Sequence, residues 1–241
     1  MPNKHHQTLL KLIQSNAGKG TQHTFLDSYL GNTNPRYAIN APTLRRLARQ
    51  WMKDHQDLSV SEFARLLTSL IEGKSSTEKC LAGVLLDYSS EAQRKFDPKL
   101  FDRWLDHLEG WAEVDTVCTG DYTITEIPEN WRVWKKLLVQ LSKSKNVNKQ
   151  RASLVLLCSP LRHITDHEMS QTALNITDRL RNEKDIRITK AISWILRSMI
   201  KHYRPLVVEY LNENSEHIPK IAVRETMMKL NTGTKTKRKV K

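Results

Sequence analysis

The stretch that decides the fold is DIRITKAISWILRSMIK, which covers residues 185–201. At about 100° per residue, one face of a helix here is apolar. This face carries Ile188, Ala191, Ile192, Ile195, Leu196 and Met199. The opposite face has a stripe at i, i+4, i+7 and i+11, made of Lys190, Trp194, Arg197 and Lys201. The pattern predicts an amphipathic helix with an indole at the centre of a basic stripe.

Helical periodicity extends over the rest of the chain, and no stretch alternates as a strand does. Helices are expected at 5–15, 42–54, 59–71, 76–88, 97–108, 129–142, 148–158, 166–180, 185–201, 204–213 and 216–229. Short helices with short connections are typical of stacked helix pairs of about 40 residues. The sequence therefore predicts an all-α fold, a right-handed α-α superhelix or curved solenoid built from degenerate helix pairs.

Local signals mark several of the expected helix starts. Ser59 with Glu62, and Ser75 with Glu78, have the spacing of a capping box. Proline is tolerated in the first turn of a helix, where its missing N–H is not needed. The prolines expected near helix starts are Pro42, Pro98, Pro128 and Pro205.

We expect residues 1–230 to form a single domain and residues 231–241 to be a disordered basic tail. The region 16–41 is the least regular part and is expected to mix a short helix with a loop. The three cysteines are widely spaced, which argues against disulfides and a zinc site and fits a reducing cytoplasm. Neither a secretory segment nor an apolar run of membrane-spanning length is recognisable.

The charge of the chain favours a polyanionic partner. Lys and Arg number 39 against 26 Asp and Glu, a formal net charge of +13. Five of these charges lie in the tail, so the rest of the chain still carries +8. This excess favours nucleic acid over the alternative of a merely basic protein.

The other tryptophans divide between core and candidate site. In 42–54 the apolar face includes Trp51, and the opposite face carries Arg46, Arg49 and Lys53. Spacing also assigns Trp104, Trp131 and Trp134 to the core. Trp111 and Asp115 are spaced i, i+4, so a helix would place them on one face. Asp115 is either part of a site or an acid favoured by a helix dipole, and Trp194 could instead pack under a neighbouring repeat.

Five short motifs in order carry a resemblance to a known family. They are S-Y-L-G at 28–31 with Y-A-I-N-A-P-T-L-R at 37–45, W-A-E-V-D at 111–115, Q-R-A at 150–152, K-A-I-S-W-I-L-R at 190–197 and R-E at 224–225. With them the chain resembles the AlkD-type DNA alkylation-repair glycosylases, which are built from HEAT-like helical repeats. Ser193, Ser198 and Asn148 depart from the family pattern, which has Gly, Glu and an aromatic residue there.

The resemblance implies which residues act. The family's functional positions fall on Trp111, Asp115, Arg151 and Trp194. The acid and the two indoles would contact the damaged nucleotide, with Asp115 stabilising a cationic sugar, and Arg151 would hold a flanking phosphate. Further phosphate contacts are expected from the basic stripes, namely Arg46, Arg49, Lys53, Lys190, Arg197 and Lys201.

The expected function is that of a DNA glycosylase, a hydrolase that excises cationic N3- or N7-alkylated purines from double-stranded DNA. We expect a cytoplasmic, nucleoid-associated monomer that needs no metal and no cofactor. Two alternatives stay open, a non-catalytic DNA-binding protein of the same fold and a protein-interaction scaffold.

Overall fold

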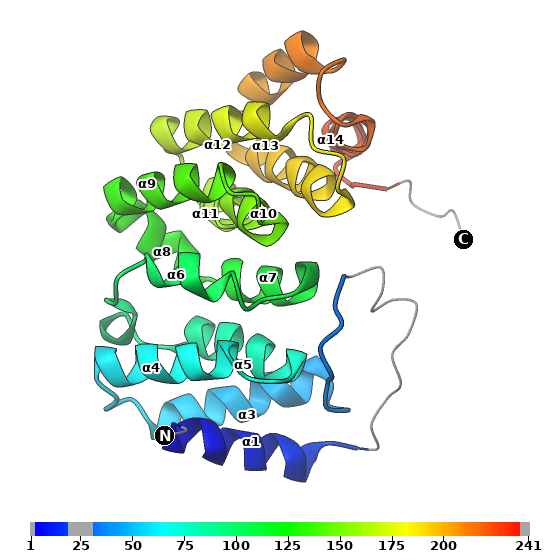
Figure 1. Cartoon of the computed structure of the whole chain (residues 1–241). Coiled ribbons are helices and arrows are strands. Elements are labelled where there is room, and N and C mark those ends of the chain that lie inside the picture. Colours follow the sequence, from blue (N-terminus) through cyan, green and yellow to red (C-terminus); the bar gives the residue numbers. More distant parts are fainter. Residues whose placement is uncertain (1–2, 19–30, 237–241) are drawn as a thin grey trace. The chain divides into compact units, whose positions relative to one another are not determined.

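The computed structural model describes residues 3–18 and 31–236, and within these ranges the regular secondary structure is helical (Figure 1). The chain divides into two compact units, Met1–Tyr122 and Thr123–Lys241. The expected short helix within 16–41 and the end of the expected disordered tail fall on residues 19–30 and 237–241, which lie outside the described residues.

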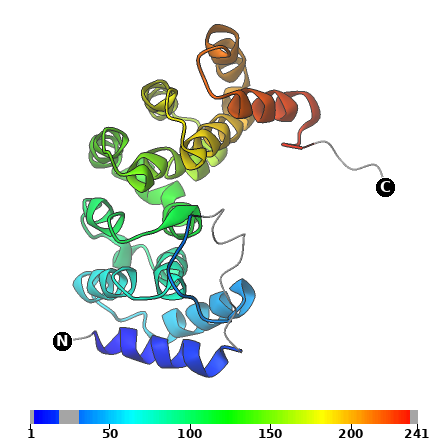
Figure 2. The same ribbon diagram turned by 45° about the vertical axis from the view of Figure 1, so that its right-hand side comes forward.

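The helices of the first unit form two layers. They are α1 (Lys4–Asn16), α3 (Ala41–Asp54), α4 (Val60–Ile71), α5 (Ser76–Tyr88), the 3-10 turn η1 (Ala92–Arg94), α6 (Leu100–Trp104) and α7 (Gly110–Cys118). Helix α5 packs between α3 and α7, while α1 packs against α4 (Figures 1 and 2). Alternate helices thus share a layer, as expected of stacked helix pairs.

The second unit repeats this arrangement. It contains α8 (Tyr122–Glu129, whose first residue belongs to the first unit), α9 (Trp131–Ser142), α10 (Val147–Val155), α11 (Cys158–His163), α12 (His167–Leu180), α13 (Ile186–Asn214) and α14 (Lys220–Thr232). Helix α9 packs on α12, and α13 contacts α10, α11 and α14. The predicted all-α, HEAT-like fold class is confirmed.

Most predicted helix starts are confirmed, but some boundaries were wrong. Both capping boxes form, at Ser59 with Glu62 and at Ser75 with Glu78. Pro128 is a correction, because it lies near the end of α8 rather than at a helix start. Helices α7 and α8 were not among the predicted helices, since they are only 9 and 8 residues long.

Helix α13 contains the stretch that predicted the fold. The two helices expected at 185–201 and 204–213 are joined, with a kink where Tyr203 has non-helical angles (φ −129°, ψ 34°). Pro205 follows two residues later, and proline lacks the N–H that a straight helix would use. The prediction of two helices is therefore confirmed, with the kink at Tyr203 between them.

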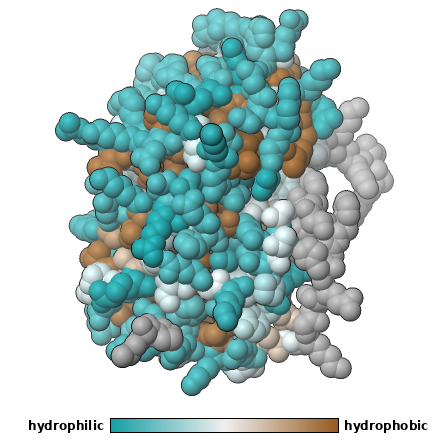
Figure 3. Space-filling model, in the orientation of Figure 1, coloured by the Kyte–Doolittle hydropathy of each residue, from teal (hydrophilic) through white to brown (hydrophobic). Residues whose placement is uncertain are grey.

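The core is built from the predicted apolar faces. Trp51, Trp104 and Trp134 are buried as predicted, but Trp131 is only half-buried, so its assignment to the core was wrong. Hydrophilic side chains cover most of the face drawn in Figure 3. No helix within the described residues has both the length and the hydropathy needed to cross a membrane.

Candidate functional site

Helix α7, in the first unit, carries two of the candidate residues. Trp111 and Asp115 lie one turn apart on it, so their expected helical spacing is confirmed. The Trp111 side chain is buried, with 9% of its surface exposed, whereas Asp115 is half-buried. The indole is therefore fixed in the first unit, and the carboxylate lies at the edge of solvent.

Two glycines determine where α7 lies. Gly110 starts the helix at φ 62°, a backbone conformation that residues with a side chain rarely adopt. Gly83 lies on α5 where the two helices meet, and a Cβ atom there would be 2.3 Å from the carbonyl oxygen of Thr116. This close approach fixes the backbone next to Asp115, so a side chain at Gly83 would displace the candidate acid.

A carboxylate network anchors the segment 32–34 to the start of α7. The buried Glu113 accepts hydrogen bonds from the side-chain amides of Asn32 (3.0 Å) and Asn34 (3.1 Å). Its second oxygen accepts the backbone N–H of Glu109 (2.7 Å), which satisfies a helix-start donor. Glu109 in turn accepts both the backbone N–H and the hydroxyl of Thr33.

Burial sets the ionisation of this network. Desolvation raises the pKa of Glu113, even though neutral donors and the charge of Lys79 favour its carboxylate. Burial likewise lowers the pKa of Lys79, whose ammonium donates to the carbonyl oxygens of Ile71 and His107. The buried side chains of Glu113 and Lys79 thus hold the start of α7 in place.

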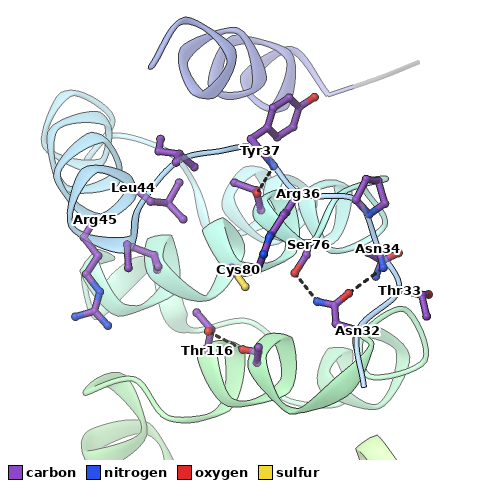
Figure 4. Close-up of a pocket in the computed structure, with 16 residues that line it drawn as sticks. Asn32, Thr33, Asn34, Arg36, Tyr37, Leu44, Arg45, Ser76, Cys80 and Thr116 are labelled. Carbon is purple, nitrogen blue, oxygen red and sulfur yellow. Dashed lines mark hydrogen bonds between the residues drawn. The ribbon is translucent and has the colours of Figure 1, made fainter. Parts of the chain in front are cut away.

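A cavity of about 540 Å³ opens beside α7 within the first unit (Figure 4). Its α7 wall is Ala112 and Thr116, each adjacent in the chain to a candidate residue. The Arg36 side chain extends into it towards Cys80, whose pKa burial raises to about 11. Arg36 was not predicted as a site residue, although it directly precedes a quoted motif.

Helix α13, in the second unit, carries the candidate residue Trp194. Trp194 is half-buried, so the indole is accessible from solvent as the stripe predicted. The cations on either side of it are paired with Glu225 of α14, at 2.8 Å from Lys190 Nζ and 3.7 Å from Arg197. Lys190 and Arg197 were predicted as phosphate contacts, and in this structure each of them is engaged by Glu225.

Glu225 is held in its ionised form. Although burial opposes ionisation, hydrogen bonds from Lys190 and Ser193 and the charges of Lys190 and Arg197 together lower its pKa. The Ser193 hydroxyl donates to Glu225 (2.6 Å) and accepts from Arg197 Nε (3.1 Å). This explains the serine at a position where the family pattern has glycine.

The remaining predicted contacts fall into two groups. Arg151 is 2% exposed, and its guanidinium donates to the carbonyl oxygen of Arg187, so it does not present an open phosphate contact. The side chains of Lys201 on α13 and of Arg46, Arg49 and Lys53 on α3 are exposed, as a phosphate contact requires.

Comparison with known proteins shows which family this chain belongs to. A family model described as "DNA alkylation repair enzyme" matches residues 7–230. The chain belongs to this family. Among solved structures it is similar to a predicted DNA alkylation repair enzyme from Enterococcus faecalis, with a TM-score of 0.69 and 18% identity over 86% of this chain and 93% of that chain. No curated protein matches.

Membership of the alkylation-repair family supports a role in the repair of alkylated DNA, and the AlkD-type resemblance is confirmed. At 18% identity the similar structure establishes the fold alone. Two glutamates were not predicted as site residues, namely Glu113 on α7 itself and Glu225 on α14. Both lie within quoted motifs, but a buried glutamate carries no periodic signal.

Proposed function

We propose that this protein is a DNA glycosylase that removes cationic N3- or N7-alkylated purines from double-stranded DNA. The observation that carries the proposal is the half-buried Asp115, one helical turn from the buried Trp111, in a chain of the alkylation-repair family. Asp115 is the proposed catalytic residue, and Trp111 and Trp194 are the proposed contacts to the lesion nucleotide.

One carboxylate suffices for this chemistry. A purine alkylated at N3 or N7 is positively charged and leaves as a neutral base when the C1′–N bond breaks. The leaving group therefore needs no general acid, unlike the substrates of ordinary glycosidases, which require two carboxyl groups. The bonding electrons depart with the base, and the positive charge moves to the sugar.

Asp115 would stabilise this sugar cation and direct a water molecule onto C1′, after which the proton of the water is released to solvent. At about 4 Å and an effective dielectric constant near 20, an ion pair contributes up to about 4 kcal/mol. This corresponds to roughly a thousandfold in rate.

The indoles would act through their π-faces. An aromatic face attracts a cation, so Trp111 and Trp194 would favour the charged sugar over the neutral ground state. Exposed cations on both units would provide the phosphate contacts, namely Arg46, Arg49, Lys53 and Lys201. Lys190, Arg197 and Arg151 would contribute only if DNA displaced their present partners.

The test is release of free 7-methylguanine and 3-methyladenine from methylated duplex DNA. Asp115→Asn keeps the size of the side chain and removes its charge, so we expect release to fall about a thousandfold. DNA affinity should change little, because the substitution removes no cation. Asp57→Asn, at an exposed residue of the same unit, is the matched control and should behave as wild type.

A protein that binds duplex DNA but releases no base, with or without Asp115, would establish the alternative of a non-catalytic DNA-binding protein. Undiminished release by Asp115→Asn would exclude the role proposed for this carboxylate. Absence of DNA affinity at physiological salt would leave the protein-interaction scaffold.

A further inference from the structure

Two further cations of the second unit, Arg162 of α11 and Lys229 of α14, lie close enough to Arg197 of α13 for their charges to act on one another. Arg162 of α11 donates through Nη2 to the Ser198 hydroxyl of α13 (3.2 Å). Lys229 of α14 donates through Nζ to the carbonyl oxygen of Arg197 (3.0 Å). The hydrogen bonds of Arg162 and Lys229 thus go to neutral oxygens on α13, not to carboxylates.

The group carries surplus positive charge. Within the described part of the chain, Glu225 is the carboxylate whose charge acts on Arg197, and it also pairs with Lys190. Arg162 and Lys229 therefore add two charges that this carboxylate does not offset. Their repulsion is visible in the pKa of Lys229, which is lowered first by burial and then by Arg162 and Arg197.

One donor in this group is unused. Among the described residues no hydrogen-bond partner is present for Nε of Arg162, although this atom is buried. A buried donor without a partner costs roughly 1–3 kcal/mol, and more when it is charged. An arginine with one anchored nitrogen and one unused nitrogen is arranged to accept an oxyanion through its free edge.

We propose that Arg162, Arg197 and Lys229 form a binding site for a phosphate group. A tetrahedral oxyanion would satisfy Arg162 Nε and relieve the repulsion among the three cations. The ligand class is a phosphodiester of the DNA backbone or free inorganic phosphate. If the ligand is a DNA phosphodiester, this inference rests on the proposed function only in that the protein must bind DNA. It does not require that the protein excise a base.

The DNA arm measures affinity for an undamaged duplex as a function of salt, so it is independent of glycosylase activity. Each phosphate contact adds about 0.9 to the slope of log K against log salt. We expect Arg162→Gln and Lys229→Gln each to weaken binding about tenfold at physiological salt and to reduce the slope by ~0.9. The control is Lys136→Gln, an exposed lysine on α9, which should change neither value.

The phosphate arm measures Tm in inorganic phosphate and in chloride at equal ionic strength. A ligand that binds only the folded state raises Tm in a saturable way. Wild type and Lys136→Gln should respond, and Arg162→Gln should not. In chloride, Lys229→Gln should have a Tm equal to or higher than that of wild type, because it relieves repulsion. A merely structural lysine would lower it.

Each combination of results decides the proposal. Weaker DNA binding without a phosphate response assigns the site to the phosphodiester, and a phosphate response with unchanged DNA binding assigns it to free phosphate. The proposal is overturned when phosphate gives no shift and both cluster variants bind DNA like Lys136→Gln.

Discussion

Each unit contains a buried glutamate close to candidate residues, Glu113 on α7 and Glu225 on α14, and the pKa values of the two are shifted in opposite directions. Glu113 of the first unit is fully buried among neutral amide donors, and its pKa is raised. Glu225 of the second unit is 6% exposed among Lys190, Ser193 and Arg197, and its pKa is lowered. Glu113 anchors the segment 32–34 through uncharged donors, whereas Glu225 holds the cations Lys190 and Arg197 in place.

This difference between the surroundings of Glu113 and Glu225 suggests that the two units have different roles. The hydrogen bonds that order the start of α7 come from the neutral amides of Asn32 and Asn34 and from the backbone N–H of Glu109. The stripe around Trp194 needs positive charge held in place, and an ionised Glu225 fixes two of its cations. The four predictions below test how the two units differ in stability, in pH dependence and in their contribution to DNA binding.

The largest expected effect distinguishes the two indoles. Trp111→Ala removes a buried side chain and should lower the free energy of unfolding by about 3–5 kcal/mol. Trp194→Ala removes a half-buried side chain and should lower it by only about 1–2 kcal/mol. Denaturant unfolding measures both values.

Base release at 15 °C, where both variants should stay folded, is the second readout for the indoles. Trp194→Ala should lose about tenfold through the lost cation–π contact. An equal loss of stability in both variants would contradict the assignment of Trp111 to the core and Trp194 to the surface.

The second effect concerns the support of α7. Glu113→Gln replaces one acceptor oxygen by an NH₂ group that faces the donors of Asn32, Asn34 and Glu109. We expect a loss of about 2–3 kcal/mol in the free energy of unfolding, because buried donors are left unsatisfied. Glu91→Gln, in an exposed ion pair with Lys95, is the control and should change stability by less than about 0.5 kcal/mol.

The third prediction uses the opposite pKa shifts. A raised folded-state pKa, as for Glu113, gives stability that is present at acid pH and is lost as pH rises through that pKa. A lowered pKa, as for Glu225, gives stability that is present at neutral pH and is lost as pH falls below the unfolded value near 4.5. The penalty of Glu113→Gln should therefore grow towards acid pH, and that of Glu225→Gln should shrink.

Urea unfolding of wild type and both variants from about pH 2.5 to pH 7 measures these penalties on both sides of the unfolded value. Penalties that change in the same direction with pH would remove the distinction between the two glutamates. A pH-independent penalty for Glu225→Gln would mean that its cations do not hold it ionised.

The faces of single helices could be predicted from the sequence, but the partners of those faces could not. The 3.6-residue period identified the apolar face of α13 and the i, i+4 pairing of Trp111 with Asp115, because both follow from one helix alone. The pairing of Lys190 with Glu225 joins residues 35 positions apart, and no local pattern encodes it. The same reason applies to the burial of Arg151, which depends on its contact with Arg187 of α13.

The smallest effect compares a cation of each unit. Arg46 of α3 is exposed, whereas the Lys190 side chain is 22% exposed and bound to Glu225. Arg46→Gln should leave stability within about 0.5 kcal/mol and weaken DNA binding a few-fold, with the salt slope reduced by ~0.9. Lys190→Gln should instead lower the free energy of unfolding by about 1–2 kcal/mol, because Glu225 loses a partner.

Filter binding over a salt series together with thermal unfolding separates the two cations. The informative quantity is the ratio of lost affinity to lost stability, since both variants remove one positive charge and differ only in what that charge contacts. If Lys190→Gln reduced the salt slope as much as Arg46→Gln and left stability unchanged, Lys190 would leave Glu225 for a phosphate when DNA binds. In that case Lys190 would be paired with Glu225 only in the free protein. A DNA phosphate would replace Glu225 as its partner in the complex.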